Sequence, residues 1–184
     1  MKNIFENQFC LLAAAVVMLL GFSGCTTNYD VLEPIPEYPE LTRQYNTAAT
    51  VEYVPYSDAA LNKIIRENLK INNYKDIISG VHYKGDRKNP VRIIVPLELR
   101  NQVFKCANGN FLETRVILMV RQPGEIHNGA LVYPAPRYFQ AFSQLRLLES
   151  AAQASEINAG IVQCVENLFR IEEFRSALEP DSSR

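Results

Sequence analysis

The chain has 184 residues, a formal net charge of −1 and a hydrophobic content of 47%, with 9 tyrosines and 9 phenylalanines. This length and composition suit one folded domain with its own core and are not typical of a disordered chain. The balanced charge gives no basic excess for a nucleic-acid partner and no acidic excess for a cation buffer, so neither function class is expected.

The first element is an apolar segment that ends in small residues and a cysteine. Phe9–Leu20 carries no charge and is soon followed by Phe22-Ser23-Gly24-Cys25. The segment suits the core of a signal peptide, whereas crossing a ~30 Å hydrocarbon layer takes about 20 apolar residues. The last four residues resemble the lipobox of bacterial lipoproteins, although Phe22 stands where leucine is usual. An ordinary signal peptide with a chance cysteine, or a single anchoring helix, is the alternative.

The lipobox resemblance implies how this end of the protein is processed and where it lies. Residues 1–24 would be removed as a signal peptide, and Cys25 would carry diacylglycerol, usually with a further acyl chain such as palmitate on the new amino group. Two or three acyl chains anchor a protein stably, whereas one gives only marginal binding. Thr26, rather than aspartate, follows the cysteine, which favours an outer-membrane lipoprotein that faces the periplasm.

Residues 25–45 form the next segment, in which Pro34, Pro36 and Pro39 lie close together. Each proline sets φ and lacks a backbone donor, so the segment is predicted to be an extended tether. As polyproline-like chain it reaches on the order of 60 Å, at ~3.1 Å per residue. A spacer that lifts the domain off the membrane is the simplest interpretation, and a ligand for a proline-binding domain is the alternative.

A strand, a helix and a second short strand are predicted at the start of the domain. Thr47–Pro55 alternates its side chains in the manner of a strand and ends at a proline. Ser57-Asp58 then caps a helix that ends at Asn72-Asn73, and its apolar residues recur three and four positions apart. Ile77–Tyr83 favours a short strand before the polar, cationic loop 83–90.

Val91–Arg121 holds the strongest signal, which is two long β-rich runs on either side of Asn108-Gly109. Asn-Gly favours a two-residue type I′ turn, and this predicts an antiparallel hairpin. In the register that this turn sets, the apolar residues of both strands meet on one face, as a half-buried antiparallel pair requires. They are Val91, Ile93, Val95, Leu97, Leu99, Val103, Leu112, Val116, Leu118 and Val120.

The opposite face of this hairpin is mixed, with apolar side chains among charged ones. Its apolar residues are a candidate surface for a partner: Ile94, Phe104, Phe111, Ile117 and Met119. A covering segment, self-association or a partner protein would each explain them. Partial cover by the tether, or scattered exposure, is the structural alternative.

The chain closes with an edge strand and a helical region. Ala130–Phe139 reads as an extended segment, and because Pro134 and Pro136 lack a ladder donor it is predicted to lie at a sheet edge. Ser143–Leu178 has the periodicity of a helix that packs on the sheet, and residues 179–184 are a polar tail.

Cys106 and Cys164 are the cysteines that remain in the working domain. The predicted hairpin places Cys106 on its mixed face, whereas Cys164 belongs to the apolar stripe of the last helix. This separation favours two thiols without a disulfide. A bulge that turned Cys106 over would instead allow a disulfide in the oxidising envelope.

No motif for catalysis, for a metal or for a cofactor occurs in the sequence. His82 and His127 are the only histidines, and they lack the spacing of a metal site. There is no G-x-S-x-G, no glycine-rich phosphate loop and no C-x-x-C. The protein is therefore expected not to be an enzyme, with no catalytic residue, no metal and no cofactor.

One basic cluster is a candidate binding site for an anion. It consists of Lys84, Arg87, Lys88 and Arg92. Such a cluster suits an anionic lipid, the phosphates of lipopolysaccharide or a glycan, although a short basic run is also often a solvated loop.

The order of these elements is tether, strand, helix, antiparallel strands and long helix. It predicts an α+β two-layer sandwich over residues 46–178, with an antiparallel sheet of about four strands and two helices packed on one face. This order resembles the lipopolysaccharide-assembly lipoprotein family, in which a lipidated cysteine, a strand, a helix, a meander and a closing helix follow one another. The resemblance covers most of Thr47–Leu178 as an order of elements, and it implies a role in delivering lipopolysaccharide at an outer-membrane barrel.

The leading functional hypothesis is an envelope assembly or scaffold lipoprotein without enzymatic activity. It would be held to the membrane at Cys25 and would bind an envelope protein or an anionic glycolipid, in outer-membrane lipopolysaccharide assembly. A tethered regulator of a cell-wall synthase, or of another periplasmic complex, is the alternative. An envelope hydrolase would need His82 or His127 within ~3 Å of its reaction partners.

Overall fold

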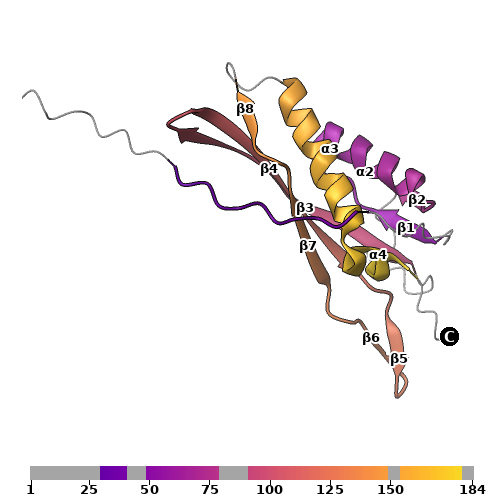
Figure 1. The fold of residues 1–184 in the computed structure, drawn as a ribbon. Coiled ribbons are helices and arrows are strands. Elements are labelled where there is room, and N and C mark those ends of the chain that lie inside the picture. The colour runs from indigo at the N-terminus through magenta and orange to yellow at the C-terminus, as the bar shows by residue number, and fades with distance from the viewer. Residues whose placement is uncertain (1–29, 41–48, 79–90, 149–153, 180–184) are drawn as a thin grey trace, which may run out of the picture. The chain divides into compact units, whose positions relative to one another are not determined.

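The computed structural model describes residues 30–40, 49–78, 91–148 and 154–179. Val31–Arg184 forms one compact unit, and the fold described here is that of this unit. Its helices and strands are shown in Figure 1. In chain order they are β1 (Thr50–Tyr53), α2 (Ala59–Ile71), β2 (Lys75–Ile78), β3 (Arg92–Cys106), β4 (Gly109–Arg121), β5 (Glu125–His127), β6 (Ala130–Val132), β7 (Arg137–Phe142), β8 (Arg146–Leu148), α3 (Ala154–Arg170) and α4 (Glu172–Leu178).

The main sheet is mostly antiparallel and has the strand order β2-β1-β3-β4-β7, with β8 also paired to β4. The pairs of β1 with β2 and with β3 are parallel, because α2 carries the chain back between β1 and β2. Helices together with a largely antiparallel sheet confirm the α+β class. The expected number of about four strands is too low, since the described residues form six in this sheet and a separate β5–β6 hairpin.

α2 forms where its caps and its periodicity predict it. Asp58 is the N-cap, and its carboxylate accepts a hydrogen bond from the backbone N–H of Leu61 at 2.8 Å. Asn72 is the C-cap, and Asn73 follows in the left-handed region at φ 63°. The buried side of the helix consists of Leu61, Ile64, Ile65 and Leu69.

The C-terminal region is not the single long helix that its periodicity favours. Arg146–Leu148 is a strand, and the helical part divides at Ile171 into α3 and α4, so the described residues contain three helices instead of two. The division brings Phe174 onto two neighbouring rings, with centroid separations of 5.3 Å to Phe169 and 5.2 Å to Phe139. These edge-to-face contacts stabilise the packing of α4 against α3 and β7.

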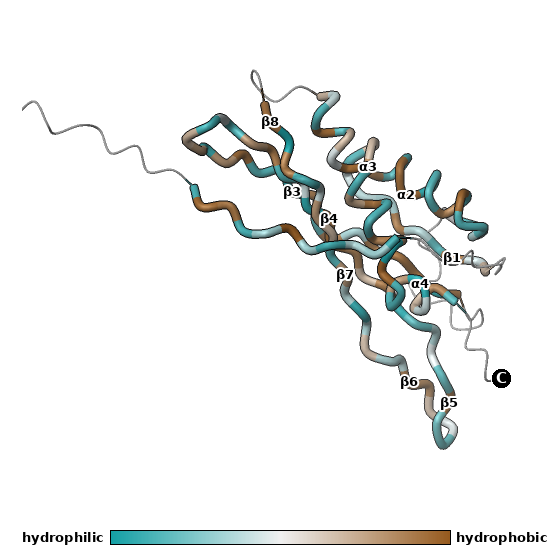
Figure 2. Tube along the Cα trace, in the orientation of Figure 1, coloured by the Kyte–Doolittle hydropathy of each residue, from teal (hydrophilic) through white to brown (hydrophobic). Residues whose placement is uncertain are grey.

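The helices share one core with a single face of the sheet. Side chains of α2, α3 and α4 lie in the same buried cluster as Val51, Tyr53, Ile94, Val116, Leu118 and Phe139. α3 lies close to β4 at Gly160, where an added Cβ would be 2.2 Å from Thr114 Oγ1. The Cys164 thiol donates a hydrogen bond to the Thr114 carbonyl at 3.0 Å. Figure 2 shows the matching alternation of hydrophobic and hydrophilic residues along the strands.

The β3–β4 hairpin exists, but its turn lies one residue nearer the N-terminal strand than predicted, which shifts the pairing of the two strands by two residues. Phe104 pairs with Phe111 and Cys106 with Gly109, so the turn residues are Ala107 and Asn108. A type I′ turn at Asn108-Gly109 would need positive φ at both residues, yet of the two only Gly109 has it, at 137°.

A β-bulge at Leu97 changes which side chains of β3 face the helices. The pairing shifts between Pro96 and Glu98, so Leu97 has no partner on β4. Because one extra residue reverses the alternation, Ile94 lies on the helix-covered face and is fully buried. Ile93 and Val95, which the sequence places toward the helices, lie on the other face.

The predicted edge strand Ala130–Phe139 is divided in the structure: its first part is β6 of the separate hairpin, and its last part begins β7, which pairs only with β4 at the end of the sheet order. Pro134 and Pro136 lie in the connection between β6 and β7, where no ladder donor is needed. Cys106 and Cys164 do not form a disulfide, and they lie at the end of β3 and in α3 as predicted.

Candidate functional site

The sheet presents a second face on the side away from the helices, here called the open face. β4 alternates buried and half-buried residues along its length, and its half-buried side chains point to the open face. Phe111, Ile117 and Met119 belong to this half-buried set, and Phe104 joins them from β3 through its pairing with Phe111. The structure therefore brings together four of the five residues predicted as a partner surface.

Ile94 is the exception and does not belong to the open face. The sequence places it there by simple alternation from Phe104, but the bulge at Leu97 turns it into the core. A one-residue irregularity of this kind has no local signature in an otherwise regular β-rich run.

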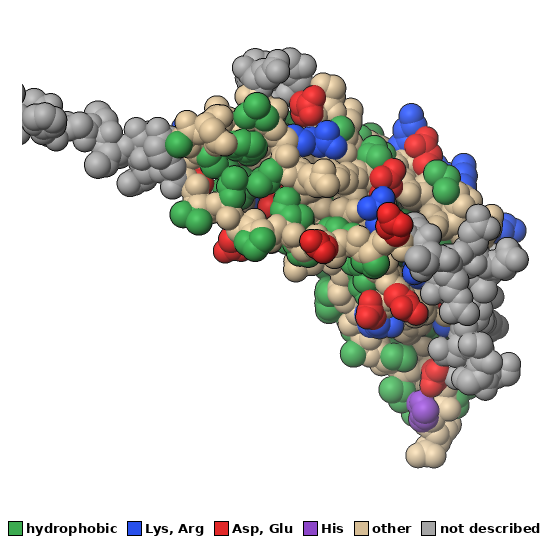
Figure 3. All heavy atoms as spheres, in the orientation of Figure 1, with side chains coloured by type: hydrophobic (Ala, Val, Ile, Leu, Met, Phe, Trp, Pro, Cys, Tyr) green, Lys and Arg blue, Asp and Glu red, His purple; other side chains and the backbone are tan. Residues whose placement is uncertain are grey.

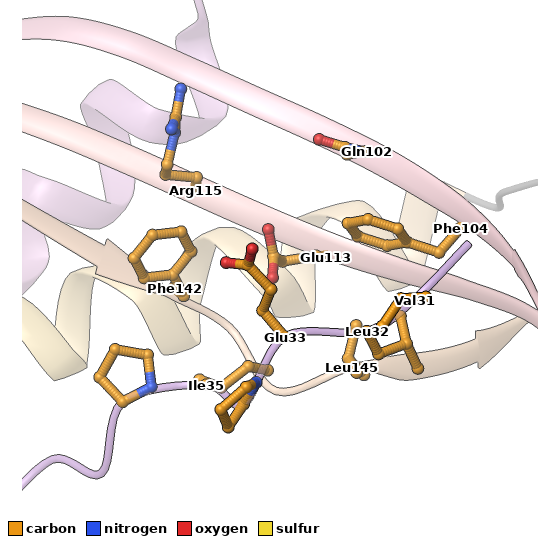
Figure 4. Close-up of a pocket in the computed structure, with 12 residues that line it drawn as sticks. Val31, Leu32, Glu33, Ile35, Gln102, Phe104, Glu113, Arg115, Phe142 and Leu145 are labelled. Atoms are coloured by element: carbon orange, nitrogen blue, oxygen red, sulfur yellow. The ribbon is translucent and has the colours of Figure 1, made fainter.

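The residues predicted as a free tether are partly seated on the domain. Val31–Tyr38, here called the strap, is extended chain that runs across the open face (Figure 4). A hollow of about 410 Å³ lies between the strap and the sheet. It is lined by Val31–Pro36 and by Gln102, Phe104, Glu113, Arg115, Phe142 and Leu145.

Tyr38 holds the far end of the strap at the sheet edge. Its hydroxyl oxygen accepts a hydrogen bond from the backbone N–H of Phe142 at 2.9 Å, and its ring packs against the core. The Phe142 carbonyl accepts another bond from Asn167 Nδ2 at 2.9 Å. Side chains thus satisfy both backbone groups at the end of edge strand β7. Burial raises the pKa of the Tyr38 hydroxyl, so it remains a neutral donor and acceptor near pH 7.

Charged groups beneath the strap set its electrostatics. Arg115 binds Glu98 at 2.6 Å, while its register partner on β3 is another arginine, Arg100. Burial raises the pKa of Glu113, the two arginines partly oppose this, and Glu33 of the strap raises it further. Glu33 and Glu113 point toward each other in Figure 4, so the strap brings two carboxylates together.

Most of the predicted basic cluster cannot be placed. Lys84, Arg87 and Lys88 lie outside the described residues, as does Cys25. Arg92 is the first residue of β3, pairs with Val51 of β1 and is buried. Its side chain therefore does not belong to an exposed loop surface.

The described residues show no built metal site. They contain no group of three or more histidine, cysteine, aspartate or glutamate side chains that could hold a metal ion. His127 lies on β5, exposed, with its Nε2 3.2 Å from Glu125 Oε2, and His82 lies outside the described residues. No helix within the described ranges is both long and apolar enough to cross a membrane.

Sequence reasoning missed the exposed apolar β5–β6 hairpin. Ile126, Val132 and Tyr133 are exposed there, and its turn residues Asn128 and Gly129 have positive φ of 51° and 79°. These values suit the type I′ turn that Asn-Gly favours, so the dipeptide was an available signal for this second hairpin.

Comparisons with known proteins find a likeness among solved structures but none in sequence. No family model matches the sequence, and no curated protein matches it. Among solved structures, the chain is similar to a minor lipoprotein from Acinetobacter baumannii, with 14% identity and a TM-score of 0.43. The match covers 73% of this chain and 98% of that one.

Proposed function

We propose that this protein is a lipid-anchored envelope protein that binds a partner on the open face of its sheet and catalyses no reaction. In this proposal the helices form one layer and the sheet the other, and the partner binds the open face beside the strap that crosses it. The observation that carries the proposal is the row of half-buried apolar side chains Phe104, Phe111, Ile117 and Met119 on a face that the helices do not cover.

Charge and hydrogen-bonding groups beside these side chains suit a protein partner. Glu98 and Arg115 form an ion pair that remains partly exposed, and Tyr138 of edge strand β7 is exposed next to Met119. An apolar centre with a polar rim and an exposed tyrosine is the usual composition of a protein–protein interface.

The anchor part of the proposal rests on Phe22-Ser23-Gly24-Cys25 and the apolar segment before it. Acylation of Cys25 would hold the protein to a membrane of the cell envelope. An outer-membrane position facing the periplasm, and a role in lipopolysaccharide assembly, are the specific form of the proposal. An envelope protein is the expected partner and an anionic glycolipid the expected cargo.

The strap weighs against the alternative of a regulator that reaches across the periplasm. A free tether over residues 25–45 would extend on the order of 60 Å. Because the strap is seated on the domain from Val31 onward, only the chain from Cys25 to Val31, which are six residues apart, can span the distance to the anchor, and it reaches on the order of 20 Å. A protein held so near its anchor suits a partner in the same membrane.

Site-specific photocrosslinking in cells tests the partner surface. A photoreactive residue at Ile117 or at Met119 is expected to crosslink one and the same envelope protein, or lipopolysaccharide. The control is the same residue at Ile71, which is 76% exposed at the end of α2 and does not belong to the open face. Equal crosslinking from all three positions, or none from Ile117 and Met119, would refute the proposed surface.

The anchor is tested separately by feeding cells radiolabelled palmitate. The wild-type protein is expected to incorporate label and to sediment with membranes. Cys25→Ser should lose both properties, because Cys25 is the proposed site of acylation. A Cys25→Ser protein that keeps the label and the membrane location would contradict the proposed anchor.

A further inference from the structure

We infer that the free end of the β3–β4 hairpin lies on the surface of the membrane that carries the anchor. This surface, here called the hairpin tip, consists of Val103–Leu112, Leu145–Leu148 and the first strap residue, Val31. Its occupant is the lipid headgroup layer of the bilayer. The inference rests on the proposed acylation of Cys25 and adds an orientation of the domain to it.

Chain length is the first argument. Cys25 and Val31 are six residues apart, and an extended chain spans at most ~3.6 Å per residue, so Val31 lies within about 20 Å of an acylated Cys25. Val31 and Leu32 line the hollow together with Phe104, which is two residues before the end of β3 (Figure 4). The anchored end of the strap therefore meets the domain at the hairpin tip, and the strap then leads away from it toward Tyr38.

The composition of the hairpin tip is the second argument. Val31, Val103 and Leu147 are 87%, 45% and 54% exposed, and Phe104 and Phe111 form a half-buried cross-strand pair beside them. Figure 3 shows hydrophobic side chains gathered at this end of the unit. Exposed aliphatic and aromatic side chains around a turn are the groups that enter the interfacial layer of a bilayer.

The charge of the hairpin tip matches an anionic membrane surface. Within Val103–Leu112 the single charged residue is Lys105, and within Leu145–Leu148 it is Arg146. These two segments contain no carboxylate of their own, although Arg146 is paired with Glu156 of α3 at 3.8 Å, so Lys105 is the basic residue that the inference uses to attract anionic headgroups. A basic side chain near such a surface is attracted to it.

The other exposed apolar region lies farther from the anchor than the hairpin tip does. The β5–β6 hairpin carries Ile126, but it follows the opposite end of β4, which has 13 residues. At ~3.3 Å per residue, β4 separates the two ends by about 40 Å, twice the reach of the chain from Cys25. The anchor therefore holds the hairpin tip close to the membrane, whereas it does not by itself bring the β5–β6 hairpin there.

Depth-dependent fluorescence quenching tests the orientation. The acylated protein carrying Cys106→Ser is labelled with a small fluorophore at Val103→Cys, and in separate samples at Leu147→Cys and at Ile126→Cys. Each is reconstituted into vesicles of phosphatidylethanolamine and phosphatidylglycerol that contain a lipid-borne quencher. Labels at 103 and 147 are expected to be quenched several-fold more than the matched control at 126.

The outcomes separate the inference from the proposal on which it rests. Intact mass spectrometry first reports whether lipid is present on Cys25. An acylated protein whose labels at 103 and 147 are quenched no more than the label at 126 overturns the orientation alone. A protein without lipid on Cys25 overturns both the anchor and the orientation. Two labelled positions guard against a local disturbance at either one.

Discussion

Replacing Tyr38 by phenylalanine removes one hydroxyl and leaves the ring that packs against the core. In the structure this hydroxyl accepts the backbone N–H of Phe142 at 2.9 Å. A hydrogen bond of this kind contributes roughly 0.5–1.5 kcal/mol to the free energy of unfolding. If the acceptor is removed and the donor is fully buried, the unpaired donor lowers the free energy of unfolding by about 1–3 kcal/mol. Phe142 is only half-buried, so water can partly replace the lost acceptor and the expected cost is about 1 kcal/mol.

Amide hydrogen exchange measures this cost at the residue concerned. A change of about 1 kcal/mol corresponds to roughly a fivefold change in an equilibrium constant. The Phe142 amide is therefore expected to exchange at least about fivefold faster in Tyr38→Phe than in the wild type. The matched control is the next amide, because Ser143 donates to the Thr114 carbonyl at 2.9 Å and does not depend on the strap.

The reasoning would be refuted by equal exchange of the Phe142 amide in both proteins. In that case the strap would not be held at Tyr38 by this hydrogen bond. Faster exchange of the Ser143 amide as well would mean that the substitution had loosened the end of β7 as a whole. The free energy of unfolding is expected to fall by about 1 kcal/mol in a urea titration. Far-UV circular dichroism follows this titration, because the protein has no tryptophan whose fluorescence could report unfolding.

Three further predictions follow from single contacts. Gly160→Ala should lower the free energy of unfolding by about 1–3 kcal/mol in a urea titration, because the new Cβ would be 2.2 Å from Thr114 Oγ1. Without this clash, alanine would stabilise the helix by about 1 kcal/mol. A gain in stability would therefore contradict the described packing of α3 on β4. The pKa of Glu113 is higher in the folded state than its ordinary value of 4.5, so ionisation of Glu113 destabilises the folded state. The stabilising contribution of the protonated carboxyl group is therefore lost as the pH rises from 4.5 through the raised pKa. Glu113→Gln should therefore be more stable than the wild type at pH 7, with the difference vanishing near pH 4.5, and a difference that is independent of pH would refute this. Burial raises the pKa of Cys164 to about 12, so its thiol should resist alkylation at pH 8 in the native protein and react only after unfolding; rapid labelling of the native protein would contradict the described burial.

The α+β class and the positions of the main elements could be predicted because they depend on near neighbours in the chain. Asp58 and Asn72 end α2 through contacts made within four residues, and the helical period selects its buried side. The same local logic identifies β4 from its alternation and places β7 at an edge from Pro134 and Pro136. The two cysteines likewise stay apart because strand alternation and helix periodicity direct them to different places.

The register of the hairpin shows how far this local logic extends. Moving the turn from Asn108-Gly109 to Ala107-Asn108 shifts the pairing by two residues, and two residues restore the same face of a strand. The predicted helix-facing side of β4 therefore survives an incorrect turn. The bulge at Leu97 adds one residue, which reverses the face, and so Ile94 enters the core and leaves the candidate surface.

The sequence by itself determined most element types, their order and four of the five residues of the apolar candidate surface, because period, caps and turn residues act over a few positions. Only the tertiary structure decided the bulge, the six-stranded pairing and the seat of the strap. The decisive hydrogen bond of the strap joins Tyr38 to Phe142, which are 104 positions apart. Contacts over such a separation depend on the assembled sheet and helices, and they leave no local pattern from which they can be read.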